Sequence, residues 1–257
     1  MKPQVLVLRA AGSNCDMETA YAFDLAGGKS DMVHINRVVS GEVHIRDYQI
    51  LAIPGGFTYG DDISAGKVMG NQLKYLLAEM LTDFYNEGKL ILGICNGFQV
   101  LVKAGLLPKL DFNAEQTVTL TNNDNGMYTD RWVYLRVNPG PCVFTQGMHE
   151  VIYIPVAHAE GKFIVRQPSV LQELIDGQQI AFQYVKPDRG AAEYPWNPNG
   201  SVADIAGICD PSGRILGLMP HPERHIDPTQ HPRWTRAGLA RGGDGLPLFR
   251  NAVRFFA

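Results

Sequence analysis

The stretch Gly93-Ile94-Cys95-Asn96-Gly97-Phe98-Gln99 follows a short apolar run, residues 90–92, and precedes a helix-like segment, residues 100–104. Glycines two residues before and after a central side chain are typical of a nucleophile elbow, a sharp strand-to-helix turn in which the backbones approach closely. Here the central residue is Cys95. We expect the helix dipole to lower the pKa of this thiol and the N–H of Asn96 to be free for an oxyanion. A buried structural cysteine in a tight turn is the alternative.

The chain before this stretch alternates apolar runs with helix-like segments, which predicts βα units. The runs read as buried parallel strands over residues 5–8, 32–35, 50–53 and 90–94. Helices are expected over residues 17–26 and 73–84, the second as one amphipathic helix with a buried stripe. The third strand runs into Pro54-Gly55-Gly56-Phe57, and adjacent glycines at a strand's carboxyl end are where such sheets place ligand-facing backbone. An ordinary glycine turn is equally compatible with this stretch.

After Pro108 the pattern changes to alternating, turn-rich segments, which predict antiparallel or mixed strands. These segments cover residues 117–121, 131–137 and 151–155, and residues 179–185, 205–209 and 215–219 read as further strands. Residues 227–245 read mostly as loop, followed by a short helix over 246–256. We therefore expect one α/β domain over residues 1–257, with an open, mostly parallel sheet, flanking helices and added antiparallel strands.

Composition excludes several function classes. A net charge of -3 and no run of like charges disfavour a nucleic-acid partner. No apolar run reaches the length of a membrane span, and the chain's start does not resemble a signal peptide, so a cytoplasmic protein without a membrane partner is expected. The four cysteines form no C-x-x-C pair, which disfavours a disulfide framework or a zinc site. Residues 59–67 superficially suggest a phosphate loop, but their glycine spacing does not fit one.

A cysteine nucleophile needs a base, and the base needs an orienting acceptor. Among seven histidines, His221 directly follows a predicted core strand, with Glu223 two residues later. Pro222 keeps His221 out of helical geometry, so both side chains can point the same way. A metal site made of His221, Glu223 and His225 is a weaker interpretation, because the proline breaks the helix that such spacing requires. No cofactor or metal is expected in this chain.

These features together resemble the triad-type (class I) glutamine amidotransferases, whose fold is flavodoxin-like. Within that family the closest resemblance is to the glutaminase components of phosphoribosylformylglycinamidine synthases. The stretches that carry it span most of the chain: Gly12-Ser13-Asn14-Cys15-Asp16, Gly55-Gly56-Phe57-Thr58-Tyr59-Gly60-Asp61, residues 93–99, Pro155-Val156-Ala157-His158-Ala159-Glu160-Gly161, and residues 197–201 with 219–224. Two departures are Ala159, where glycine is expected, and a long tail over residues 227–257.

The resemblance implies roles for individual residues. Cys95 would attack the side-chain amide of glutamine, His221 would relay protons to the leaving ammonia, and Glu223 would hold the imidazole. The N–H groups of Gly56 and Asn96 would form the oxyanion hole. Substrate glutamine would contact Gln99 and Gly55, whereas His158 and Glu160 either orient the partner or the ammonia exit or only shape a loop.

The resemblance also implies partners. Glutaminase components of this type pass ammonia to a separate synthetase subunit, which would bind ATP and magnesium and amidate formylglycinamide ribonucleotide in purine biosynthesis. A small accessory subunit of the same complex is expected too.

Three alternatives remain at this point. The first is an amidotransferase that serves another synthetase, such as those making GMP, CTP or anthranilate. The second is a stand-alone cysteine hydrolase or peptidase of similar fold, which would need an exposed substrate groove. The third is a non-catalytic binding subunit, which the presence of Cys95, His221 and Glu223 disfavours.

Overall fold

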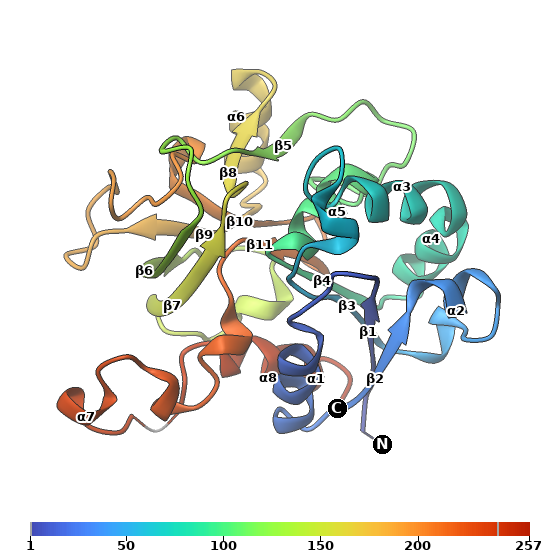
Figure 1. The fold of residues 1–257 in the computed structure, drawn as a ribbon, viewed down its shortest axis with the longest axis horizontal. Coiled ribbons are helices and arrows are strands. Elements are labelled where there is room, and N and C mark those ends of the chain that lie inside the picture. Colours follow the sequence, from blue (N-terminus) through green and yellow to red (C-terminus); the bar gives the residue numbers. More distant parts are fainter. Residues whose placement is uncertain (1, 241) are drawn as a thin grey trace.

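The computed structural model describes residues 2–240 and 242–257, and a nine-stranded sheet runs through it (Figure 1). Its strand order is β2-β1-β3-β4-β11-β10-β9-β6-β7. The strands are β1 (Gln4–Arg9), β2 (Lys29–His34), β3 (Ile50–Ile53), β4 (Leu90–Ile94), β6 (Thr129–Val137), β7 (Val151–His158), β9 (Ile180–Val185), β10 (Ile205–Cys209) and β11 (Ile215–Leu218).

The sheet has a parallel half and an antiparallel half. Strands β2, β1, β3, β4 and β11 pair in parallel, in the order typical of flavodoxin-like sheets. Strands β10, β9, β6 and β7 continue the sheet with antiparallel pairing. Every residue of β3, β4 and β11 is buried, because helices cover both faces of this half. The predicted fold class is confirmed.

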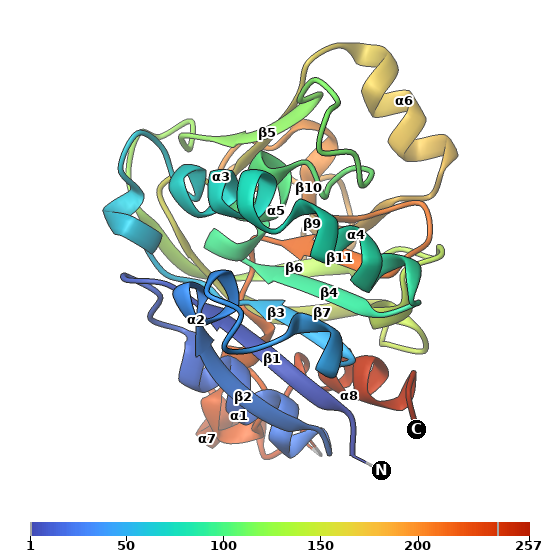
Figure 2. The same ribbon diagram turned by 90° about the vertical axis from the view of Figure 1, so that its right-hand side faces the viewer.

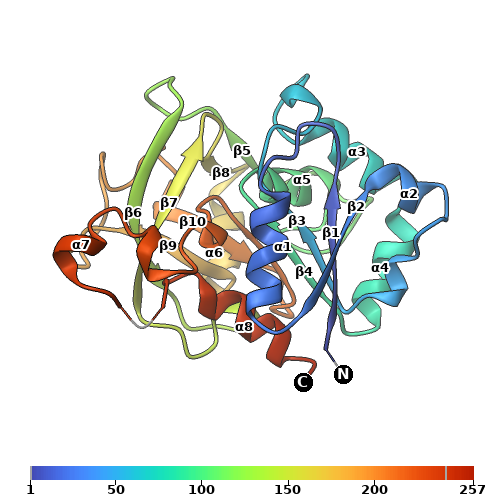
Figure 3. The same ribbon diagram turned by 60° about the horizontal axis from the view of Figure 1, so that its bottom comes forward.

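Helices form a layer on each face of the sheet. Figure 2 shows α3, α4 and α5 on one side of the strands, with α1 and α8 on the other. Figure 3 shows α1 beside α8, and the two helices contact each other. The helices are α1 (Asp16–Leu25), α2 (Ile35–Val39), α3 (Lys67–Leu76), α4 (Ala78–Asn86), α5 (Asn96–Ala104), α6 (Pro168–Asp176), α7 (Trp234–Ala237) and α8 (Leu246–Arg254). No helix of the described part is both long and apolar enough to cross a membrane.

The single helix predicted over residues 73–84 was wrong, because α3 and α4 meet at a break. Leu77 leaves helical geometry, with φ -123° and ψ 5°, while its side chain is fully buried. The break turns Leu76 and Met80 outward, where they are 53% and 39% exposed. Packing of Leu77 into the core outweighs the continuous apolar spacing here.

The sequence prediction also missed four elements: the helices α2, α6 and α7 and the strand β8. Strand β8 (Lys162–Val165) pairs with β5 (Val118–Thr121) in a separate two-stranded sheet. Helix α6 begins at Pro168 and buries Val170 and Leu174, four residues apart on one face. A proline at the first helical position and this spacing are the signals that predict such a helix.

Candidate active site

Three strand ends meet at one edge of the sheet and gather the residues singled out in the sequence. Strand β4 lies between β3 and β11, with Ile53 opposite Gly93 and Leu218 opposite Ile94. Because these strands are parallel, their carboxyl ends share an edge, which is where open α/β sheets place their sites. The loops that begin at this edge carry the two glycines after β3, Cys95 after β4, and His221 after β11.

Cys95 stands at a strained turn between β4 and α5. Its φ and ψ are 52° and -106°, a conformation that side chains rarely adopt. The turn requires both flanking glycines: a Cβ on Gly93 would lie 2.6 Å from the carbonyl oxygen of Gly97, and one on Gly97 would lie 1.9 Å from that of Ile53. The predicted elbow geometry is therefore present, and strain of this kind is concentrated at functional sites.

His221 and Glu223 form a buried pair. Nδ1 of His221 lies 2.6 Å from Oε1 of Glu223, and the two side chains are 2% and 0% exposed. Burial alone would lower the pKa of His221, but the charge of Glu223 and the neighbouring Cys95 and Cys15 outweigh it. The pKa of His221 is therefore raised well above its ordinary value. This environment favours an imidazolium held by a carboxylate.

The thiol and the imidazole line one narrow cavity. Cys95 and His221 both border a space of about 20 Å³ next to Gly56. Among the described residues, Nε2 of His221 has no hydrogen-bond partner, while the Cys95 thiol lies 3.6 Å from the carbonyl oxygen of Ala157. The structure thus brings together a nucleophile, a base with a free nitrogen and an acceptor behind the base.

Two backbone N–H groups beside the thiol are available for an oxyanion. Within the described part of the chain, neither Gly56 nor Asn96 donates its backbone N–H to an intramolecular acceptor. The side chain of Asn96 fixes the loop that follows Gly56, because its Oδ1 accepts from the hydroxyl of Thr58 at 2.6 Å. Gly56 has a φ of 145°, and a Cβ there would meet the backbone of Gly12 and Asn14 at 2.7 Å. The hydrogen bond of the Asn96 side chain and the close approach of Gly56 to Gly12 and Asn14 thus restrict the positions of both N–H groups.

Gly55 has a different reason to be glycine. A Cβ at this position would lie 2.8 Å from the imidazole of His221 and 3.3 Å from the sulfur of Cys15. Gly55 therefore allows the β3 loop to pass directly against the His221 ring.

Gln99 borders a second cavity, of about 40 Å³, that also reaches Cys95. Its side-chain amide donates to the carbonyl of Glu160 at 2.6 Å and accepts from Nδ2 of Asn96 at 2.9 Å. The carboxylate of Glu160 accepts in turn from the N–H of Ala65. These bonds tie the start of α5 to the loop after β7, so Gln99 also shapes the cavity that it lines.

His158 has a fixed protonation state. Its Nδ1 lies 3.1 Å from Oδ1 of Asn123, which also accepts from the N–H of Gly161, so Nδ1 carries the proton. Burial, helped by the charge of His221, lowers the pKa of His158 to about 3. The ring is therefore neutral, and its buried Nε2, which has no partner among the described residues, is an acceptor only.

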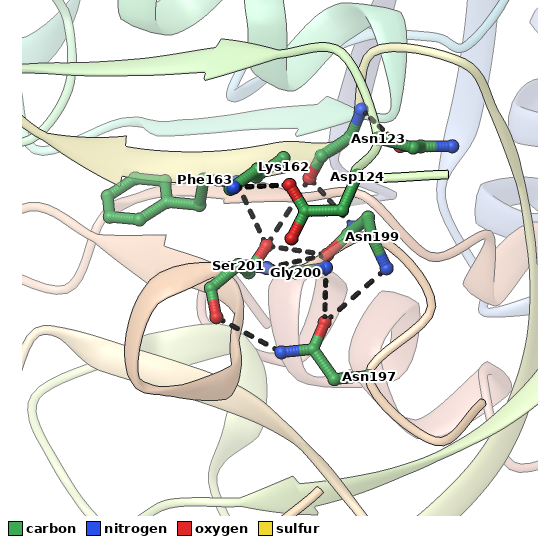
Figure 4. A network of polar contacts seen from close by, with 9 residues as sticks. Asn123, Asp124, Lys162, Phe163, Asn197, Asn199, Gly200 and Ser201 are labelled. Carbon is green, nitrogen blue, oxygen red and sulfur yellow. Dashed lines mark hydrogen bonds and ion pairs between the residues drawn. The ribbon is translucent and has the colours of Figure 1, made fainter. Parts of the chain in front are cut away.

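A polar network holds the loop of residues 158–161, and Figure 4 shows its members Asn123, Asn199 and Ser201. Nδ2 of Asn123 donates to the carbonyl of His158 at 2.9 Å. Asn199 donates to the carbonyl of Gly161 at 2.8 Å, and Ser201 donates to Oδ1 of Asn199 at the same distance. The sequence alone indicated no role for residues 197–201. Ala159, where glycine was expected, is exposed and has no positive φ, so its Cβ does not disturb this loop.

Replacement of Asn123 by leucine is expected to destabilise this loop. The substitution leaves the carbonyl of His158 and the N–H of Gly161 without partners, at a cost of about 2–4 kcal/mol of unfolding free energy. Urea unfolding measures the loss. Asn122→Leu is the matched control, because Asn122 is exposed. Equal unfolding free energies for both variants would contradict the assigned role of the network.

Cys15 and Arg224 are two residues of the site whose position the sequence analysis missed. The thiol of Cys15 lies 4.0 Å from Nδ1 of His221, accepts from Nη2 of Arg224 at 3.0 Å and donates to Oδ1 of Asn14 at 3.2 Å. Burial raises the pKa of Cys15, which keeps it a neutral thiol. Both residues lie in stretches quoted for the resemblance, but nothing local in the sequence places them together.

Among the described residues, the group whose donor atoms lie close enough to hold a metal is not the group that the sequence suggested. Cys15, His221 and Glu223 offer atoms within 4.8 Å of one another. These atoms already bond one another or Arg224. His225, the third residue of the sequence hypothesis, instead directs Nδ1 at the carbonyl of Tyr153 at 2.8 Å. The arrangement fits proton transfer better than metal coordination.

Comparison with known proteins agrees with this geometry. Residues 2–256 match the family model described as the CobB/CobQ-like glutamine amidotransferase domain. The chain is 48% identical to phosphoribosylformylglycinamidine synthase subunit PurQ of Dehalococcoides mccartyi, over 99% of this chain and 98% of that protein. It is 45% identical to the PurQ subunit of Methanococcus maripaludis strain S2, over 99% and 97% of the two chains.

A solved structure extends the comparison to the fold. The structure of PurLQS from Thermotoga maritima contains a chain that matches with a TM-score of 0.76 and 29% identity, over 100% of both chains. The chain therefore belongs to the CobB/CobQ-like glutamine amidotransferases and, within them, to the PurQ subunits of phosphoribosylformylglycinamidine synthase.

Proposed function

We propose that this glutamine amidotransferase hydrolyses glutamine through a thioester on Cys95 and passes the ammonia to a synthetase subunit. The observation that carries the proposal is the convergence of Cys95, the His221–Glu223 pair and two free backbone N–H groups at one sheet edge. A nucleophile, an oriented base and oxyanion donors are the parts that acyl transfer requires.

In the first step the proton of the Cys95 thiol passes to His221, and the sulfur forms a bond to the amide carbon of glutamine. The carbonyl oxygen becomes an oxyanion, and the N–H groups of Gly56 and Asn96 are placed to stabilise it. His221 gives its proton to the amide nitrogen, the carbon–nitrogen bond breaks, and ammonia leaves. Glu223 stabilises the imidazolium before this transfer.

In the second step water attacks the thioester. His221, now neutral, takes a proton from the water as its oxygen bonds to the acyl carbon. The carbon–sulfur bond of the second oxyanion then breaks, which releases glutamate, and His221 returns its proton to the sulfur of Cys95. Atoms balance, because one glutamine and one water give one glutamate and one ammonia.

The fate of the ammonia follows from the relatives' names. They are subunits of phosphoribosylformylglycinamidine synthase, and the solved structure is of PurLQS. We therefore propose that the ammonia amidates formylglycinamide ribonucleotide on a separate synthetase subunit, with ATP and magnesium bound there, and that a small accessory subunit completes the complex. A cytoplasmic location is consistent with the four free thiols.

Reconstitution tests the function. The chain is mixed with the synthetase and accessory subunits of the same organism, ATP, magnesium and formylglycinamide ribonucleotide, and amidine and glutamate are measured. Glutamine-dependent amidine formation is expected only when the chain is present. Amidine formation from ammonium salts but not from glutamine would overturn the proposal, as would efficient cleavage of peptides by the chain alone.

A further inference from the structure

The two cavities that meet at Cys95 differ in their chemistry. They share Gly56, Phe57, Cys95 and Ala157, so they adjoin at Cys95. The larger cavity carries Gln99 and Glu160, whereas the smaller one carries His221 and Arg224. The proposed reaction creates two fragments at this point: an acyl chain on sulfur and an ammonia molecule.

The position of His221 decides which cavity receives the ammonia. The imidazole gives its proton to the departing nitrogen, so this nitrogen must leave on the His221 side of Cys95. Only the smaller cavity is bordered by His221. Its volume of about 20 Å³ is sufficient for one molecule the size of water or ammonia.

Arg224 places a permanent positive charge at this cavity. Its side chain is 34% exposed, its Nη2 donates to the sulfur of Cys15 at 3.0 Å, and its Nε lies 3.7 Å from Oε1 of Glu18. The guanidinium cannot lose its proton in a protein. The end of the Arg224 side chain that faces His221 thus contacts the neutral thiol of Cys15 rather than a carboxylate.

We propose that the cavity between His221 and Arg224 is a binding pocket for ammonia, and that the charge of Arg224 keeps this ammonia unprotonated. The inference rests on the proposed glutaminase function. A fixed cation disfavours ammonium in the pocket but has no comparable effect on neutral ammonia. Only the neutral form is a nucleophile, so the charge maintains the form that a synthetase can use. Six titratable groups face Arg224 or line the pocket: Cys15, Glu18, Cys95, Tyr128, His221 and Glu223.

The experiment measures coupling, which is the amidine formed per glutamate released by the complete complex with its synthetase. This ratio cancels any general loss of glutaminase activity. Arg224→Gln is expected to lower the ratio by roughly half near neutral pH, and the ratio should recover as the pH rises and ammonium loses its proton. Arg224→Lys keeps the charge and should keep most of the coupling.

A second variant makes the test independent of the folding of Arg224→Gln. Asn14→Asp adds a carboxylate of nearly the same shape beside Cys15 and is expected to lower coupling in the same direction. Arg189→Gln is the control, because Arg189 forms an exposed pair with Glu150. Amidine formation from ammonium salts should be the same in all variants.

Unchanged coupling in Arg224→Gln and Asn14→Asp at every pH would overturn the inference. If Arg224→Gln does not fold, unchanged coupling in Asn14→Asp alone decides against it. Failure of the proposed function looks different, since the unsubstituted complex would then form no amidine from glutamine at all.

Discussion

Replacement of Cys95 by alanine is expected to abolish glutamine-dependent amidine formation by the complex. The thiol borders the same cavity as Gly56 and His221, and it immediately precedes the free N–H of Asn96. Cys15, the other thiol at this cavity, lies beside Nδ1 of His221, which Glu223 occupies. Alanine removes the atom that forms the thioester, and water without such an intermediate does not replace it. Losses of about 10⁶-fold are typical when a nucleophile of this kind is removed. Glutamate release and thioester trapping with labelled glutamine measure the effect.

Two controls separate loss of chemistry from loss of folding. The Cys95→Ala complex should still form amidine from ammonium salts, because that reaction needs only the synthetase. Cys142→Ala removes another buried thiol and should leave glutamine turnover intact. Cys142 lies at the opposite end of the sheet, because the N–H of its neighbour Val143 donates to the carbonyl of Gly213, just before β11 begins. Glutaminase activity that survives in Cys95→Ala would show that another residue is the nucleophile.

The elements around Cys95 were predictable because their determinants are local. Strands β3, β4 and β11 are short apolar runs bounded by turn residues, and the structure buries them completely. The Gly-x-Cys-x-Gly spacing determines the elbow by steric exclusion alone, as the 1.9 Å approach of a Cβ on Gly97 to Ile53 illustrates. His221 and Glu223 are two residues apart, so their pairing also needed only local backbone geometry.

The rest of the site depends on contacts between distant segments. Cys15 meets His221 across 206 residues and Arg224 across 209, distances along the chain over which no periodicity or spacing carries information. Asn123 likewise reaches His158 across 35 residues. The break at Leu77 also depends on distant contacts. Packing of Leu77 into the core determines it, whereas the apolar spacing of residues 73–84 predicts a continuous helix. Only the assembled sheet and its loops bring these residues together.

Glu223→Gln is expected to lower turnover with glutamine by roughly 10²–10⁴-fold while changing glutamine binding little. The amide can still accept from Nδ1–H of His221, so the ring keeps its place, but the charge that stabilises the imidazolium is gone. Turnover and binding are separated by comparing kcat with KM and with the rate of thioester formation in a single turnover. Glu150→Gln, in an exposed pair with Arg189, is the matched control. Unchanged kcat would assign the orienting role to another residue.

The same substitution should change how stability depends on pH, and the sign follows from the pKa of His221. Glu223 raises this pKa in the folded protein above about 6.5, its value in an unfolded chain. The pair therefore contributes its full stabilisation below about pH 6.5, and this is lost as the pH rises through the folded-state pKa. In Glu223→Gln burial still lowers this pKa, and only Cys95 and Cys15 oppose it. We thus expect the difference in unfolding free energy between Glu223→Gln and the unsubstituted chain to be largest in mildly acidic buffer and to shrink toward alkaline pH. A difference that does not vary with pH would mean that His221 is uncharged in the folded protein, in which case Glu223 orients the ring without stabilising its cation.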